Sequence, residues 1–223
     1  MSLAAPPTAA NPPPSPQARF WDRMARRYAA ARIADEAGYE RTLARTQALL
    51  PPAARVLEIG CGTGTTALRL APACARYRAT DVSPGMLAIA RDRLAAQPVA
   101  ALRFELADAA APQADEPVDA VLAFNVLHLV DSLDATLATC AAALRPGGLL
   151  ICKTPCLHEM NPLIPRLALP LARLLRLAPP VRSLREADLT AAMARQGLVV
   201  QGVERHASRG RDFRPFIVAR RPG

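Results

Sequence analysis

The stretch VLEIGCGTGTTA, residues 56–67, runs from apolar residues with one acid into three glycines spaced two apart, Gly60, Gly62 and Gly64. The pattern predicts a short strand over Arg55–Ile59 and a helix that begins over Gly64–Leu70. Glycine lets the main chain approach a ligand because no Cβ intervenes. The helix that follows presents free N–H groups to an anionic group. The stretch therefore predicts a ligand cradle at the end of a strand.

Outward from this stretch, strands alternate with helices. The further predicted strands are Tyr77–Thr80, Leu102–Leu106, Val118–Phe124 and Leu149–Cys152, and then Val199–Val203 and Phe216–Ala219. Alternation of this kind argues for an α/β, Rossmann-like doubly wound sheet, here of seven strands and mostly parallel, with helices on both faces. The last two strands have no helix between them and predict an antiparallel edge hairpin, joined by the basic loop RHASRGRDFR.

The expected domain organisation is simple. Residues 1–16 are uncharged and rich in proline, which predicts a disordered tail. Residues 17–223 form one domain, in which 17–50 make two helices and 154–185 make a substrate cap. Ser183 and Glu186 predict a capping box for the last helix, which ends at Gly197.

Composition narrows the function classes. No apolar run reaches the roughly 18 residues that span a bilayer, and no secretory signal is expected. The five cysteines lack CxxC spacing, which predicts reduced thiols in a cytoplasmic protein. Cys152, Cys156 and His158 lack a standard zinc spacing, so we predict no metal, although a shared ion stays a minor alternative.

The net charge of +9 is unevenly distributed. Residues 1–144 hold 14 basic and 14 acidic residues, whereas residues 145–223 hold 14 basic and 5 acidic residues. The last third could therefore face an anionic substrate, a lipid surface or only solvent. Within it, residues 161–182 mix leucines with arginines and prolines. This segment would offer an apolar wall to a hydrophobic acceptor, a peripheral membrane contact, or simply a cover for the sheet edge.

Asp81 follows the second predicted strand. A carboxylate there can accept hydrogen bonds from both hydroxyls of a ribose. The alternative is a helix cap, a role that Ser83 already fills. Gly62, Gly64 and Ala67 also match the dinucleotide fingerprint, so these features alone leave a dinucleotide and an adenosyl sulfonium compound as candidate ligands.

Five motifs distinguish the two ligands. These motifs occur in order between residues 56 and 151: VLEIGCGTGTTA, ATDVSPGMLAIAR, FELADA, VDAVLAFNVLHLV and LRPGGLLI, within a resemblance that covers roughly residues 17–153. Together they resemble the class I S-adenosylmethionine-dependent methyltransferases, and the resemblance implies S-adenosylmethionine as the cofactor. A nicotinamide oxidoreductase is the weaker alternative, because the Tyr-x-x-x-Lys pair of short-chain dehydrogenases is missing: position 149, four before Lys153, is leucine.

The resemblance also implies a role for individual residues. The glycine turn would line the methionine and ribose part of the cofactor, with an acid beneath it and Asp81 on the ribose. Two apolar residues would lie against the adenine, an Asp-Ala pair would meet the adenine edge, and residues after the fourth strand would face the methionine end. The implied cofactor-binding residues are Tyr28, Glu58, Gly60, Cys61, Gly62, Gly64, Asp81, Val82, Met86, Asp108, Ala109, Phe124 and Asn125.

Three of these residues keep a structural alternative. Tyr28 would close over the cofactor from the amino-terminal helices, or pack in the core. Asp108 would accept a hydrogen bond from the adenine amino group, or serve a turn. Met86 would contact the adenine, or fill the core.

His128 is the candidate catalytic residue. It lies four residues past the fourth predicted strand, at the rim of the cleft, and an unperturbed histidine titrates near neutrality. A structural histidine is the alternative, and His158 and Glu159 are the next candidates. We expect methyl transfer to a small, hydrophobic organic acceptor. The alternatives are a nucleic-acid or protein methyltransferase and a non-catalytic binding module. No nucleic acid is expected, because aromatic residues make up only 4% of the chain. The oligomeric state is open.

Overall fold

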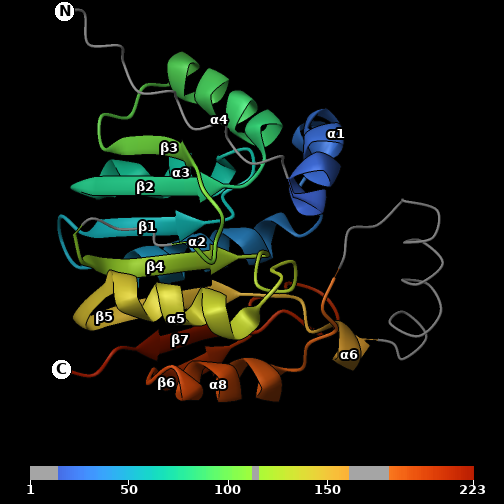
Figure 1. Ribbon diagram of the computed structural model, residues 1–223. Helices are drawn as coiled ribbons and strands as arrows, with labels where there is room; N and C mark the ends of the chain where they lie inside the picture. The colour runs from blue at the N-terminus through green and yellow to red at the C-terminus, as the bar shows by residue number, and fades with distance from the viewer. Residues whose placement is uncertain (1–14, 112–115, 161–180) are drawn as a thin grey trace, which may run out of the picture.

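A computed structural model describes residues 15–111, 116–160 and 181–223, apart from the side chain of Met160. Its centre is a seven-stranded sheet with the order β3-β2-β1-β4-β5-β7-β6 (Figure 1). The strands are β1 (Arg55–Ile59), β2 (Arg76–Asp81), β3 (Leu102–Leu106), β4 (Val118–Phe124), β5 (Leu144–Lys153), β6 (Val199–Glu204) and β7 (Phe216–Arg220). The first five run parallel, and β7 is antiparallel to both β5 and β6. The predicted doubly wound sheet with an antiparallel edge hairpin is confirmed.

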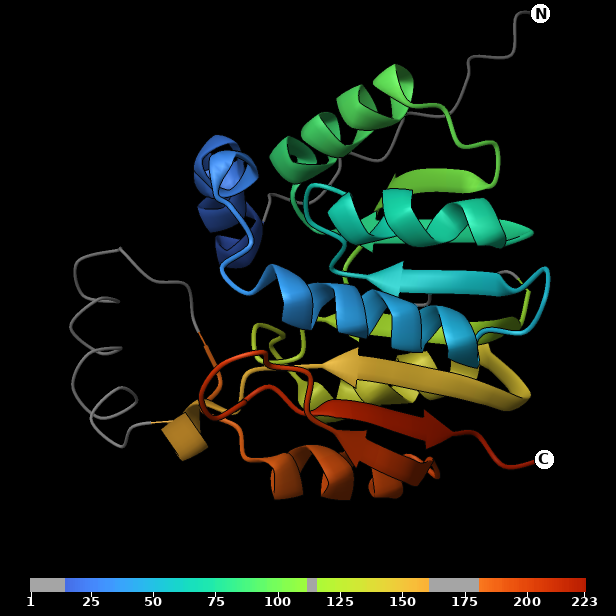
Figure 2. The same ribbon diagram turned by 180° about the vertical axis from the view of Figure 1, so that it is seen from behind.

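Helices cover both faces of the sheet. They are α1 (Pro16–Ala30), α2 (Glu36–Leu49), α3 (Thr65–Leu70), α4 (Pro84–Ala96), α5 (Leu133–Ala143), α6 (Leu157–Met160) and α8 (Glu186–Arg195), with a short 3-10 turn at Ala71–Ala73. One core cluster joins the sheet to α5 and α8, and a second joins the opposite face to α2, α3 and α4. Figures 1 and 2 show these two layers from opposite sides.

Strand β1 is buried on both faces. Leu57 and Ile59 join the cluster under α5 and α8, whereas Val56 joins the cluster under α2 and α3. A central parallel strand must be apolar on both sides, which is why VLEI is nearly continuous rather than alternating. The exception is Glu58, whose side chain is buried as well.

Some boundaries differ from those predicted. Helix α1 begins at Pro16, where the Ser15 side chain accepts a hydrogen bond from the Ala18 N–H, so the helix takes in the end of the predicted tail. Strand β5 begins at Leu144 and includes the Pro146-Gly147 region, where its pairing with β4 is shifted. Residues 1–14 of the predicted tail (1–16) and residues 161–180 of the predicted cap (154–185) lie outside the described residues.

The predicted Ser183–Glu186 capping box is wrong. Helix α8 starts at Glu186 with Arg185 as its N-cap residue, and the Asp188 carboxylate accepts a hydrogen bond from the Arg185 N–H at 2.8 Å. The acid three residues into the helix therefore caps it, and serine takes no part. The helix ends near Gly197, as expected, which adopts φ +72°.

The strand order reverses next to β1, since β1 pairs with β2 on one side and with β4 on the other. In open α/β sheets, ligands bind in the crevice outside the carboxyl ends of the strands at this switch point. Helix α1 lies beyond these strand ends, toward which the arrowheads of β1 and β4 point (Figure 1). The fold therefore places the glycine turn, Asp81 and the end of β4 at one edge.

Candidate functional site

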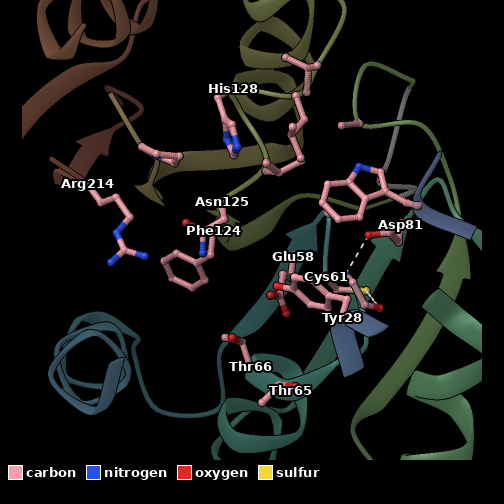
Figure 3. A pocket seen from close by; sticks show the side chains of 18 of the residues that line it. Tyr28, Glu58, Cys61, Thr65, Thr66, Asp81, Phe124, Asn125, His128 and Arg214 are labelled. Atoms are coloured by element: carbon pink, nitrogen blue, oxygen red, sulfur yellow. Dashed lines mark hydrogen bonds between the residues drawn. The ribbon is translucent and has the colours of Figure 1, made fainter. Parts of the chain in front are cut away.

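A cleft of about 1360 Å³ opens at this edge. Its walls come from the ends of β1, β2 and β4, from α1, and from the loop between β6 and β7 (Figure 3). It brings together nearly all the predicted site residues, namely Tyr28, Glu58, Gly60, Cys61, Gly62, Asp81, Val82, Met86, Asp108, Ala109, Phe124, Asn125 and His128. Gly64 does not line the cleft, and neither do His158 and Glu159, the next catalytic candidates.

The three glycines share positive φ angles but face different surroundings. A Cβ on Gly60 would lie 2.3 Å from Val126, and one on Gly64 would lie 2.5 Å from Phe104. Both glycines therefore allow close packing inside the protein. A Cβ on Gly62, by contrast, would meet only a Tyr28 ring carbon at 3.9 Å. Gly62 is the glycine that leaves room for a ligand in the cleft.

Asp81 holds the glycine turn in place. Its Oδ2 accepts a hydrogen bond from the Gly62 N–H at 2.8 Å, and its Oδ1 accepts one from the Ser83 N–H at 2.9 Å. Burial raises the pKa of this carboxyl, although the backbone hydrogen bonds oppose the shift. An ionised carboxylate has about four acceptor positions, so Asp81 can serve the turn and still accept from a ligand.

Glu58 lies beneath the turn on β1 and is fully buried. Burial raises the pKa of its carboxyl to about 7, although the Tyr77 hydroxyl, which donates to Glu58 Oε2 at 2.8 Å, opposes the shift. The negative charge of Asp81 raises it further. Two carboxyl groups facing one cleft favour a ligand that carries positive charge, because such a ligand relieves their mutual repulsion.

Two aromatic side chains of α1 close the cleft from above. Trp21 and Tyr28 both line it, with ring centroids 5.9 Å apart in an edge-to-face arrangement. Tyr28 is half-exposed, so it is not a core residue. Helix α1 is docked by Asp22, whose Oδ1 accepts from the Ser83 hydroxyl at 2.5 Å and from the Gly85 N–H at 2.8 Å. Both donors lie at the start of α4, and a negative charge near a helix N-terminus is stabilising.

The predicted adenine side is lined by Val82, Met86, Asp108 and Ala109. Met86 is buried and its side chain faces both the cleft and the core. The Asp108 Oδ1 accepts a hydrogen bond from the Ala110 N–H at 2.8 Å, which forms a turn. Asp108 therefore stabilises a turn, which was the structural alternative for this residue, and it also lines the cleft.

The opposite side of the cleft holds Phe124, Asn125 and His128 (Figure 3). Asn125 adopts φ +53°, a left-handed conformation that asparagine tolerates better than most residues, and so turns the chain sharply after β4. The buried Nδ1 of His128 has no hydrogen-bond partner in the described parts of the chain. Burial lowers the pKa of His128 to about 4. The imidazole is therefore neutral at physiological pH.

Comparisons with known proteins agree with this geometry. A family model described as a methyltransferase domain matches residues 57–150. The chain is 43% identical over 110 residues to a trans-aconitate 2-methyltransferase of Variovorax paradoxus, and 37% identical over 123 residues to an iterative polyketide synthase of Emericella nidulans. These alignments cover 48% and 50% of this chain, but only 40% and 4% of the two relatives.

A solved structure shares the fold across nearly the whole chain. It is the magnesium protoporphyrin IX methyltransferase of Synechocystis with bound SAH, at a TM-score of 0.67 and 20% identity, and it covers 92% of this chain and 95% of its own. The family model over residues 57–150, the curated relatives and the shared fold support a class I S-adenosylmethionine-dependent methyltransferase. The resemblance inferred from five sequence motifs is confirmed.

Some residues of this methyltransferase site were missed by the sequence analysis. Trp21 lies seven residues before Tyr28, two helical turns away on the same face of α1, and this spacing could have found it. Asp22 and Arg214 carry no motif, because their positions depend on tertiary contacts between distant segments.

The described residues also bear on the thiols, on a shared metal site and on membrane-spanning helices. Cys61, Cys140, Cys152 and Cys156 are buried and Cys74 is partly buried, and all five are free thiols. In the described ranges, no group of three His, Cys, Asp or Glu residues could hold a metal ion. Nor does any helix within those ranges have the length and apolar character needed to cross a bilayer.

Proposed function

We propose that this chain transfers the methyl group of S-adenosylmethionine to a small organic acceptor. The observation that carries the proposal is the joined pair of Gly62 and Asp81 at the switch point of the sheet. Gly62 leaves the main chain open to a ligand, and Asp81 adds a carboxylate at the position that suits a ribose.

The cleft fits an adenosyl sulfonium cofactor. The polar side is acidic, with Glu58 and Asp81, and the closing side is aromatic, with Trp21 and Tyr28. Its volume of about 1360 Å³ exceeds the roughly 300–1000 Å³ of a typical ligand pocket, so a second molecule has space beside the cofactor. Asp81 would hold the ribose, Met86 and Val82 would face the adenine, and Glu58 would face the methionine end.

The bound cofactor would supply an electrophilic methyl group on a positively charged sulfur that leaves as a neutral thioether. The chain's own task is therefore mainly to align an acceptor with that methyl group, which is worth up to about 7–11 kcal/mol in favourable cases. The walls of Phe124 and Asn125 would position the acceptor, and α1 would exclude water. His128, which lines the cleft, would accept a proton or a hydrogen bond from the acceptor through its imidazole.

The relatives favour a small acceptor. One is named as a trans-aconitate 2-methyltransferase and the other as an iterative polyketide synthase, and these names support a small organic acceptor. The proposal therefore names the acceptor by its class, a small organic molecule.

Calorimetric titration of the folded protein with S-adenosylmethionine, its demethylated form SAH and NAD tests the cofactor assignment. We expect heat from the first two and none from NAD. A folded protein that binds neither adenosyl compound refutes the proposal. A metabolite extract is then screened for SAH formation, and mass spectrometry identifies the methylated product. Binding of SAH without turnover of any extract would instead indicate a non-catalytic binding module.

A further inference from the structure

The loop between β6 and β7 forms one lip of the cleft. Ala207, Ser208 and Arg209, followed by the run from Arg211 to Arg214, line it. Three arginines, Arg209, Arg211 and Arg214, thus line the cleft from one loop, residues 205–215, which carries part of the excess positive charge of residues 145–223. Of these, Arg214 lies on the side of Phe124, away from Asp81 (Figure 3).

The acids near this loop are already engaged by its backbone. The Asp212 Oδ2 accepts from the His206 N–H at 2.9 Å and from the Ala207 N–H at 2.8 Å, and its Oδ1 accepts from the Arg214 N–H at 2.9 Å. The Asp35 Oδ2 accepts from the Ser208 N–H at 2.9 Å. These two carboxylates, whose residues also line the cleft, fix the shape of the loop through hydrogen bonds from its backbone.

The loop is also anchored to the body of the domain. The His206 carbonyl accepts two hydrogen bonds from the Arg41 guanidinium, at 3.0 and 2.7 Å, and the buried His206 ring stacks on Phe216 with centroids 4.5 Å apart. Arg214 therefore extends from a backbone that is held at both ends. A side chain on such a support loses less entropy when it binds a ligand.

The three cleft arginines have no ion-pair partner within the residues that the structure describes. By contrast, Arg205 of the same loop points away and pairs with Glu186 on α8. Arg211 lies over the Phe213 ring at 5.0 Å, and Arg214 lies on the same side of the cleft as Phe124 and Asn125 (Figure 3). The wall therefore combines an unpaired positive charge with an apolar ring.

We propose that the acceptor is an organic carboxylate with an apolar body, anchored by Arg214 while its body contacts Phe124 and Phe213. A guanidinium presents a planar pair of donors that matches a carboxylate, and such charge-assisted bonds are stronger than neutral ones. The identification of this ligand as the methyl acceptor rests on the proposed function. The anchor itself does not, because it can be measured by binding alone.

Trp21 is the only tryptophan of the chain and it lines the cleft, so its fluorescence reports binding there. The probes are cyclohexylacetate and its neutral amide, titrated with and without saturating SAH. We expect the acid to bind at least about tenfold more tightly than the amide. Arg214→Ala should abolish this preference, and Arg214→Lys should keep part of it. Equal binding of acid and amide to the unchanged protein overturns the proposal.

Arg220→Ala provides the matched control, because it removes the same charge from the end of β7 without touching the cleft. It should leave the preference unchanged, and a loss equal to that of Arg214→Ala would show a general charge effect and refute the anchor. In the extract screen, amidation of carboxyl groups should abolish SAH formation, whereas acetylation of amines should not. Failure of the cofactor to bind would refute the proposed function separately, since the probe titration is also run without SAH.

Discussion

Asp81 Oδ2 accepts a hydrogen bond of 2.8 Å from the main-chain N–H of Gly62, so a side chain at the end of β2 fixes the turn that follows β1. The same carboxylate accepts from the Ser83 N–H through its other oxygen. One buried acid therefore links the glycine turn to the start of α4. The shape of the cleft is set before a ligand arrives, which lowers the cost of ordering it on binding.

Asp81→Ala should weaken SAH binding about tenfold to a hundredfold or more. The variant loses both the hydrogen bonds expected with the ribose and the bond that holds Gly62, and bonds to charged groups contribute about 1.5–3 kcal/mol each. Calorimetry measures the affinity. Asp92→Ala, on the exposed face of α4, is the control and should bind SAH normally. Unchanged affinity in Asp81→Ala would exclude the carboxylate from the ligand site.

Gly62→Ala and Gly64→Ala should separate binding from stability. The new Cβ of Gly64→Ala would lie 2.5 Å from the Phe104 ring, so this variant should lose roughly 1–3 kcal/mol of unfolding free energy and keep its SAH affinity once folded. Gly62→Ala is strained by its φ of +55° but meets no protein atom closer than 3.9 Å, so it should lose less stability than Gly64→Ala, and its Cβ at the ligand cradle should lower the SAH affinity. Urea unfolding and calorimetry test the pair, and identical behaviour of the two variants would contradict the distinction.

These glycines show how far the sequence alone reaches. The apolar run before them predicts a strand buried on both faces, and the order of strands and helices then fixes the sheet and brings Asp81 beside the turn. Sequence spacing cannot tell which glycine faces the ligand, because the difference between Gly62 and Gly64 lies in Phe104 and Tyr28, which come from distant segments. The contact of Asp22 with α4 was missed for the same reason.

The start of α8 marks a different limit. Ser183 and Glu186 have the spacing of a capping box, but the helix begins at Glu186 with Asp188 as the capping acid. Several polar residues near a helix start can satisfy the same N–H groups, and tertiary packing selects among them. Cap motifs therefore locate a helix end only to within a few residues.

Asp22→Ala should loosen α1 without disturbing the sheet. The variant loses two hydrogen bonds to the start of α4, and α1 carries Trp21 and Tyr28 over the cleft. We expect faster hydrogen exchange in α1, and SAH affinity reduced by about tenfold. Exchange measured by mass spectrometry should stay normal in β1 and β4. Unchanged exchange in α1 would show that the helix is held by its apolar contacts alone.

Glu58 should make the apoprotein less stable as the pH rises. Its carboxyl has an ordinary pKa of 4.5 and a folded-state pKa of about 7, so unfolding releases a proton between these values. The unfolding free energy therefore falls as pH rises through this window. Relative to Glu58→Gln, the unchanged protein should lose about 3 kcal/mol between pH 4.5 and pH 7 or above. Chemical unfolding across this range measures the difference, and a constant difference would contradict the raised pKa.

His128→Ala should lower turnover while leaving SAH affinity intact. His128 lines the cleft, its buried Nδ1 has no hydrogen-bond partner among the described residues, and burial lowers the pKa of the imidazole to about 4. As a base it is neutral across the physiological range, so the rate should show no His128 inflection between about pH 6 and pH 8 and should fall only as the pH approaches about 4.

If the acceptor must lose a proton, removal of the imidazole should cost about 10²-fold or more in kcat. Turnover of the extract-derived acceptor across this pH range tests both points. A His128→Ala protein that binds SAH and turns over at the original rate would leave His128 with a structural role only. Its main-chain carbonyl already has one, since it accepts a hydrogen bond from the Arg182 N–H at 2.7 Å.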